Sequence, residues 1–405
     1  MRTNWAGSHT YTAAEVATPT SVKEIREIVR RSPKVKALGS RHSFTDLADT
    51  SGTQVSLAAL PIEVEAGAGV VRVSAGVRYG DLATLLAPRG LALANLASLP
   101  HISVAGAVAT GTHGSGRRNG SLATSVRALE LVDGRGESHR IEGADLAGHV
   151  VGLGVLGIVT AVELAVEPAF DVTQVVYEGL RWDALLADLD GVLGCAYSVS
   201  AFTHWTGDEV GQVWVKSRDG IVEVPGARAA TEQRHMIAGM GVENTTAQLG
   251  VAGPWHERLP HFRMGFLPSA GEELQTEYFV PFARAGEALE AVRALGELFG
   301  ETLLVSELRT VAGDDLWLSG AYGGDVLAIH FTWQRDRERV DALVARLEEV
   351  LLPLGARPHW GKVFHATADV LAPAYPRWDD FVALARARDP EGRFRNAWTE
   401  RHLGI

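Results

Sequence analysis

Three glycine-rich segments within the first 160 residues constrain this chain more than any other feature of its sequence. They lie at 39–44, 106–120 and 152–157. Neither a glycine/serine tract nor a fixed-period repeat accompanies them, which argues against a flexible linker and against a repeat protein. Because glycine lets the backbone approach a bound group closely, we expect the N-terminal part of the chain to be shaped around a ligand that carries phosphates.

The composition narrows the class of protein. The 405 residues suffice for two or three domains at about 100–200 residues each. A net charge of −11 argues against a nucleic-acid binder, and the single cysteine, Cys195, excludes a disulfide framework and a cysteine-rich metal site. There is no apolar signal segment at the start and no apolar run of about 18 residues. We therefore expect a cytoplasmic monomer that binds no membrane, nucleic acid or metal.

The third glycine segment has the sequence pattern of a nicotinamide-dinucleotide site. Residues 152–157 read Gly-Leu-Gly-Val-Leu-Gly, which matches the dinucleotide-binding fingerprint by letters. That fingerprint requires a helix after its last glycine and an acidic residue about 20 positions further on. Residues 158–166 instead alternate β-branched side chains, which predicts a strand, and Asp171 comes too early. We therefore reject a nicotinamide site here.

The remainder of the N-terminal part predicts short alternating elements. Ser21 and Glu24 form a capping box for a helix that ends near Arg31, and the strand that follows ends directly on Gly39. Residues 98–116 are small and nearly uncharged, which fits either a tightly packed buried turn or a backbone surface around a pyrophosphate. The predicted helices span 22–31 and 80–86, and the predicted strands 35–38, 54–57 and 70–73.

Past residue 166 the pattern changes to longer strands and amphipathic helices. This alternation predicts an α+β domain whose sheet is covered on one face. The predicted strands span 171–178, 212–216, 275–280 and 303–311, with a further strand at 328–333; the predicted helices span 182–189, 284–299 and 338–352.

Polar residues share one face on three of these strands. Glu307 and Arg309 form one such pair, about 7 Å apart along a strand. His330 with Thr332, and Gln275 with Glu277, form two more. The stripes fit either solvent-facing ion pairs or a polar cavity. Lys362, among aromatic residues, fits either a snorkelling surface lysine or a buried cation.

A zinc-protease motif is not formed by His256 and Glu257. The next histidine, His261, comes one position late, and Pro260 breaks the helix that such a motif needs.

The segments 39–44, 98–106 and 110–116 together resemble the vanillyl-alcohol-oxidase-type (PCMH) FAD-binding family, and 254–262 and 357–362 narrow the resemblance to its alditol oxidases. The resemblance runs over nearly the whole chain. It implies an α+β, two-domain fold, with an FAD-binding domain at 1–168, a substrate (cap) domain at 169–362 and a C-terminal segment, 363–405, that returns to the FAD-binding domain.

The resemblance also implies roles for individual residues. His42 is expected to bond covalently to the 8α-methyl carbon of the flavin. Arg309, Lys362 and Glu307 are expected to be catalytic. The residues expected to bind substrate are Ser98, Glu307, Arg309, Thr332 and Lys362, with Gln275 and His330. The residues expected to bind FAD are Ala37, Leu38, Gly39, Ser40, Arg41, His42, Ser43, Ser98, Ser103, Val104, Ala105, Gly106, Thr110, Gly111, Thr112, His113, Ile158, Val159 and His359.

The implied activity is oxidation of the C1 hydroxyl of alditols such as xylitol and sorbitol, by hydride transfer to N5 of FAD and reoxidation by O2 to H2O2. A sugar-lactone oxidase or dehydrogenase of the same fold is the nearest alternative, and a flavin-free carbohydrate-binding protein is a more distant one. Arg41 departs from the family's usual pattern, and Ala97 affects which activity the resemblance implies. Arg41 stands where a glycine is frequent, and Ala97 lies where a small residue is linked to oxygen access, so oxidase and dehydrogenase activity both stay open.

Overall fold

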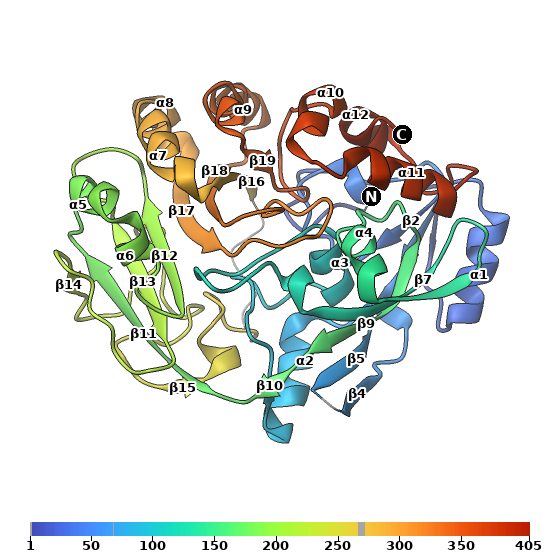
Figure 1. Cartoon of the computed structure of the whole chain (residues 1–405), viewed down its shortest axis with the longest axis horizontal. Coiled ribbons are helices and arrows are strands. Elements are labelled where there is room, and N and C mark those ends of the chain that lie inside the picture. The colour runs from blue at the N-terminus through green and yellow to red at the C-terminus, as the bar shows by residue number, and fades with distance from the viewer. Residues whose placement is uncertain (1, 68, 266–271) are drawn as a thin grey trace.

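The computed structural model describes residues 2–67, 69–265 and 272–405. The first part of the chain forms a three-stranded and a five-stranded sheet on one side of the molecule, and the middle part forms one large sheet on the other (Figure 1). The short strands β6 (Leu91–Ala92) and β10 (Glu167–Pro168) pair in a separate two-stranded sheet. The C-terminal helices, drawn in red, return to the side of the first part. Among the helices that are described, none is both long and apolar enough to cross a lipid bilayer.

The first small sheet carries the segment that leads into the first glycine loop. It is parallel, in the order β1 (Glu15–Ala17), β3 (Thr53–Ser56), β2 (Val35–Leu38). Helix α1 (Val22–Arg31) buries Ile25, Ile28 and Val29, the apolar stripe that its sequence predicts. Its capping differs from the prediction, because Glu24 accepts from the Thr20 amide rather than from that of Ser21. Ser21 still accepts from the Glu24 amide, at 3.3 Å.

The second small sheet is antiparallel and excludes the nicotinamide interpretation of residues 152–157. Its order is β4 (Val64–Gly67), β5 (Val70–Ser74), β9 (Ile158–Ala165), β7 (Val126–Val132), β8 (Ser138–Glu142). The predicted strand after Gly157 is therefore confirmed as β9. Gly157 has φ +149, and a Cβ there would lie 2.6 Å from the Val132 carbonyl oxygen. This glycine serves close strand packing, not the N-terminus of a helix.

A nine-stranded sheet, here called the cap sheet, dominates the middle of the chain. Its path runs β14 (Arg228–Ala229), β11 (Asp171–Glu178), β13 (Gln212–Ser217), β12 (Ser198–Thr203), β17 (Leu303–Val311), β18 (Val326–Gln334), β16 (Glu273–Pro281), β19 (Arg357–Pro358), with β15 (Gly253–Pro254) on β11. Strand β12 was not predicted. Its six residues are all buried and four of them are serine, alanine or threonine, so it has few of the large apolar side chains that mark a central strand.

Helices cover one face of the cap sheet, as the sequence predicts. Helix α9 (Arg337–Leu351) packs on β16, where the Tyr278 hydroxyl donates to Glu348 at 3.0 Å. Two predicted helices are interrupted. The first divides at Asp188 into α5 (Trp182–Ala187) and α6 (Leu189–Leu193), and Asp188 caps the second piece. The other divides into α7 (Ala285–Arg293) and α8 (Gly296–Phe299). The segment at 79–109 holds α2 (Tyr79–Leu86) and α3 (Val104–Ala109).

The C-terminal helices join the N-terminal part through hydrogen bonds from a side chain to backbone carbonyls. Asn396, which caps α12 (Ala397–Leu403), donates to the carbonyls of Asp46, Leu47 and Asp49. The other C-terminal helices are α10 (Ala368–Leu371) and α11 (Trp378–Arg388). The exact domain bounds stay a prediction.

Candidate active site

One large cavity lies between the N-terminal part and the open face of the cap sheet. Its atom-free space is about 2200 Å³ when the solvent at its mouth is included. Concave sites of this kind, lined by two parts of a chain, are where cofactors and small molecules bind. We call its two sides the N-terminal wall, from the loops at 36–44, 97–113 and 149–159, and the cap wall, from β16, β17, β18 and the loop at 359–362.

The N-terminal wall is made of small side chains and exposed backbone. Ser40 and Ser103 tie two of its loops together, because each hydroxyl accepts from the other residue's amide, at 2.9 and 3.3 Å. Gly39 and Gly106 sit against the same hydroxyl. A Cβ on Gly39 would lie 2.6 Å from Ser103 Oγ, and one on Gly106 would lie 2.8 Å from it. The two glycines therefore allow the loops to close on each other.

His42 presents a free imidazole to the cavity. Its ring stacks on Trp5 with centroids 5.3 Å apart, and among the described residues neither ring nitrogen has a hydrogen-bond partner. Burial lowers the pKa of His42 to about 4, so the ring is neutral at pH 7. The preceding residue, Arg41, has φ +65, a conformation that favours glycine. Its guanidinium is exposed and donates to the Thr3 carbonyl at 3.4 Å.

A buried lysine that was not predicted as a site residue also belongs to the N-terminal wall. Lys36 is 2% exposed and donates to the Gly154 carbonyl at 3.4 Å. Burial lowers the pKa of Lys36 to about 7. Its place in an otherwise apolar strand offered a signal, since a lysine in such a strand is rarely buried without a partner.

The cap wall is formed by the polar stripes, which the strand register brings side by side. Glu277 on β16 lies opposite His330 on β18, and His330 lies opposite Glu307 on β17. Gln275 lies opposite Thr332 one step along the same strands, and His330 Nε2 contacts Gln275 Oε1 at 3.1 Å. The stripes thus face a polar cavity rather than solvent.

Glu277 is the centre of the cap wall's charges. Its carboxylate lies 2.8 Å from Lys362 Nζ, 2.6 Å from the Arg309 guanidinium and 3.2 Å from His113 Nε2. Burial would raise the pKa of Glu277, but these three groups outweigh it and hold the pKa well below the usual range. Lys362 keeps 14% side-chain exposure, which makes it a cation that faces the cavity.

Glu307 and Arg309 form the second half of this cluster. Burial favours a raised pKa for Glu307, but Arg309 and His261 outweigh it and hold the carboxyl ionised. His261 Nε2 lies 2.8 Å from one carboxylate oxygen, and Arg309 Nε lies 3.6 Å from the other. Burial acts to lower the pKa of Arg309, yet Glu307 and Glu277 raise it overall. Arg309 also donates to Ser98 Oγ at 3.3 Å, which links the cap wall to the N-terminal wall.

The structure brings most of the sequence-predicted site residues to this one cavity. Val104, Gly111 and Ile158 do not line it. Val104 and Ile158 are fully buried in the hydrophobic core, and Gly111 ends helix α3 in a left-handed turn at φ +67. His359 lines the cavity, and burial lowers its pKa to about 3.

Two further residues of the cavity, Glu277 and His261, were not predicted as site residues from the sequence. Glu277 was recognised as part of a polar stripe, but nothing local distinguished it from Gln275. His261 was considered only as a failed zinc ligand, and the sequence carries no signal for its contact with Glu307.

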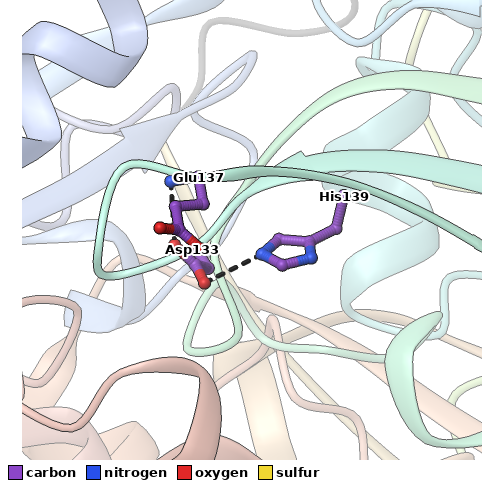
Figure 2. Close-up of side chains that lie close together, drawn as sticks. All are labelled: Asp133, Glu137 and His139. Carbon is purple, nitrogen blue, oxygen red and sulfur yellow. Dashed lines mark hydrogen bonds and ion pairs between the residues drawn. The ribbon is translucent and has the colours of Figure 1, made fainter.

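A separate group, Asp133, Glu137 and His139, lies at the turn between β7 and β8 (Figure 2). One Asp133 oxygen accepts the amides of Arg135 and Glu137, at 2.9 and 3.0 Å, and the other contacts His139 Nε2 at 2.9 Å. These bonds close the hairpin and account for the grouping as turn structure.

Both halves of the chain match known protein families. Residues 13–142 match the FAD binding domain family, and residues 271–402 match the D-arabinono-1,4-lactone oxidase family. An alditol oxidase from Streptomyces sp. (strain IKD472 / FERM P-14339) is 49% identical, with 98% of this chain and 97% of that protein covered. An L-gulono-1,4-lactone dehydrogenase from Mycobacterium tuberculosis (strain CDC 1551 / Oshkosh) is 29% identical, with 99% and 98% covered.

A solved structure shares the fold. Cholesterol oxidase from Brevibacterium sterolicum matches with a TM-score of 0.76 over 99% of this chain and 96% of that one, at 14% sequence identity. Identity this low carries an argument about fold alone. With the family matches, it confirms the mixed α and β FAD-binding fold expected from the sequence.

Proposed function

This chain belongs to the alditol oxidase family of FAD-dependent oxidoreductases, and on that premise we propose that it oxidises the terminal C1 hydroxyl of alditols to the aldose. The observation that carries the proposal is the cap wall, where Lys362, Arg309 and Glu307 surround the space next to Ser98. Two cations, two carboxylates and several neutral hydrogen-bonding groups suit a small molecule with many hydroxyls.

The N-terminal wall fits FAD. Its small residues and exposed backbone leave room for a flat ring system and a pyrophosphate, and both His42 ring nitrogens lack a protein partner in the described part of the chain. The neutral imidazole has a lone pair available for a covalent bond to the flavin 8α-methyl carbon. When bound, FAD supplies the redox chemistry, as acceptor of a hydride from the carbinol carbon and donor of two electrons to O2.

Lys362 and Arg309 act on the hydroxyl group that loses its proton. A cation close to a hydroxyl stabilises the developing negative oxygen and so lowers the effective pKa of that hydroxyl. Glu277 holds both cations on the same side of the cavity. It does so as a carboxylate, because its pKa lies well below neutrality.

Glu307 orients the substrate as a hydrogen-bond acceptor. Its low pKa makes it a weak base, so its main contribution is to accept a hydrogen bond from a hydroxyl. Ser98, Thr332, Gln275 and His330 would bind further hydroxyls along the polyol chain. Buried polar groups of this kind disfavour analogues that lack the matching hydroxyl, because the groups are then left unpaired.

The overall reaction is that of an alcohol and O2 giving an aldehyde and H2O2. Xylitol and sorbitol are the proposed substrates. The experiment is a peroxide assay of the purified protein on xylitol, sorbitol and L-gulono-1,4-lactone, together with absorption spectra before and after acid precipitation. Peroxide from the polyols and acid-stable yellow colour in the pellet support the proposal. Peroxide from the lactone alone would favour a lactone oxidase, and turnover only with an artificial electron acceptor would favour a dehydrogenase.

The covalent link has its own test. His42→Ala should give a protein whose flavin is released into the acid supernatant. Yellow colour that stays in the acid pellet of this variant would overturn the assignment of His42.

A further inference from the structure

Three buried side chains form a chain of contacts that ends at Glu307. Lys216 on β13 lies 3.1 Å from His261 Nδ1, and His261 Nε2 lies 2.8 Å from Glu307 Oε1. All three are nearly inaccessible, at 1%, 5% and 4% exposure. Lys216 does not line the cavity, whereas His261 and Glu307 do. The chain therefore reaches the cap wall from inside the protein.

The hydrogen-bond roles in this chain follow from the ionised state of Glu307. Glu307 is ionised and can only accept, so its contact with His261 at 2.8 Å requires a proton on Nε2. In the neutral imidazole Nδ1 is then the bare nitrogen, and it accepts from Lys216. Lys216 also donates to the carbonyls of Leu259 and Pro260. Burial and the neighbouring Lys216 lower the pKa of His261 to about 4, which is consistent with this neutral form.

The imidazole is also fixed in orientation by its packing. Phe202 and Trp214 contact the His261 ring edge-on, with centroids 5.5 and 5.3 Å away. The His261 amide and the Phe262 amide both approach the Ser98 carbonyl, at 3.1 and 3.3 Å, which ties this loop to the N-terminal wall. Neither the ring nor its loop can rotate without breaking these contacts.

We propose that Lys216 and His261 are positioning residues for the polyol reaction: they fix one carboxylate oxygen of Glu307, so that the other is aimed at a substrate hydroxyl. The proposal rests on the proposed function. Oε1 is occupied by His261, which leaves Oε2, 3.6 Å from Arg309 Nε, for the ligand. A carboxylate without this hold would turn more fully onto Arg309, the opposite charge beside it, and lose its hydrogen bond to the hydroxyl.

Stability alone gives a weaker account of the chain. A buried lysine is costly, and among the described residues Lys216 has no carboxylate within ion-pair distance of its own. An apolar side chain of similar length would fill the same space without that cost. What Lys216 adds is a defined proton on the side of His261 that faces Glu307.

The experiment compares three single variants with the parent enzyme: Lys216→Met, His261→Phe and His261→Gln. It also compares Glu307→Gln with the double variant that carries both Lys216→Met and Glu307→Gln. A glutamine places an amide near the position of the imidazole Nε2–H, so it retains a donor to Glu307. Tyr278→Phe is the matched control, because it removes a buried hydrogen bond from the helix-covered face of the same sheet. Flavin content, melting temperature and the kinetics of reduction by a polyol are measured for each.

We expect Lys216→Met and His261→Phe to lower kcat/KM for the polyol about 10- to 100-fold, the range of one hydrogen bond to a charged group. Flavin content should be unchanged, His261→Gln should recover most of the activity, and Lys216→Met should add little in the Glu307→Gln background. Tyr278→Phe should lower the melting temperature and leave kcat/KM alone.

Other results would overturn the proposal. An unchanged kcat/KM in Lys216→Met would overturn it. So would a Lys216→Met substitution that lowers kcat/KM by the same factor in the parent and in the Glu307→Gln background. If Lys216→Met does not fold, the His261→Gln and His261→Phe pair decides, and equal activity in the two variants would reject a role for the donated proton. Absence of polyol oxidation in the parent enzyme would instead reject the proposed function itself.

Discussion

The N-terminal wall of the cavity is built from Gly39, Ser40, Ser103 and Gly106, whereas the cap wall carries Glu277, Glu307, Arg309 and Lys362. The first wall presents backbone and short hydroxyl side chains. Its loops can pack against each other only because Gly39 and Gly106 have no Cβ atom that would collide with the Ser103 hydroxyl. The second presents charged side chains whose positions depend on one another. A cofactor wall therefore tolerates little added volume, and a substrate wall tolerates little change of charge.

The two fully buried lysines repeat this contrast. Lys36 and Lys216 both have a pKa that burial lowers to about 7. Within the described part of the chain, Lys216 lies within hydrogen-bond distance of three acceptors, whereas Lys36 has one carbonyl at 3.4 Å. The Lys216 ammonium group is thus well supplied with protein acceptors, whereas that of Lys36, which lines the cavity, is poorly supplied.

The largest effect should come from the charge at the centre of the cap wall. Glu277→Gln removes the partner of two buried cations, and we expect it to lower the free energy of unfolding by about 3–5 kcal/mol. Denaturant titration followed by circular dichroism measures this. The exposed Glu287, paired with Arg284, is the control, and Glu287→Gln should change stability by less than about 0.5 kcal/mol.

This prediction has a pH signature. The folded pKa of Glu277 is depressed, so its stabilising contribution is present above the unfolded value of about 4.3 and is lost as pH falls toward the folded value. The variant should therefore show a shallower loss of stability below that pH than the parent does. Parallel curves for the two proteins would contradict the assignment of Glu277 as a buried ion-pair partner.

Lys362→Met should give the next largest effect, and should affect chemistry more than cofactor content. Loss of one group that stabilises developing negative charge costs about 10²- to 10³-fold in rate. Anaerobic stopped-flow reduction by xylitol measures it, with the flavin absorbance as the measure of loading. The exposed Lys23 provides a control, since Lys23→Met should reduce normally. Normal reduction in Lys362→Met would remove Lys362 from the mechanism.

Gly39→Ala tests the opposite wall. The added Cβ would lie 2.6 Å from Ser103 Oγ, and such overpacking costs about 1–3 kcal/mol. We expect a lower flavin-to-protein ratio with near-normal turnover per bound flavin. Gly67→Ala, where a Cβ meets nothing within 4 Å, is the control. Unchanged flavin content would show that this wall can relax, and would weaken the distinction between the two walls.

The smallest effect concerns Arg41. A non-glycine residue at its φ of +65 costs about 1 kcal/mol, and glycine offsets part of that gain by its greater freedom in the unfolded chain. Arg41→Gly should thus stabilise by less than about 1 kcal/mol, and Arg41→Ala should not stabilise at all. Thermal unfolding of both variants measures this. Equal melting temperatures for glycine and alanine would show that backbone strain at this position is negligible.

Local patterns predicted much of the fold and part of the site. The strand after Gly157 and helix α1 were predictable because the alternation of a strand and the apolar stripe of a helix are set within a few residues. The breaks at Asp188 and between α7 and α8 were not, because both pieces of each helix keep helical composition. Only the structure shows that Asp188 ends the first piece and caps α6. Strand β12 was missed because its small residues owe their burial to neighbouring strands.

By itself, the sequence determined where glycine permits close approach and which strand residues share a face. Both properties follow from the backbone, through the missing Cβ and the two-residue period of a strand. Only the tertiary structure decided that Glu277 would lie between Lys362 and Arg309, and that His261 would hold Glu307. Those contacts join residues between 32 and 85 positions apart. They depend on the spatial order β17, β18, β16, which differs from the order of the strands along the chain.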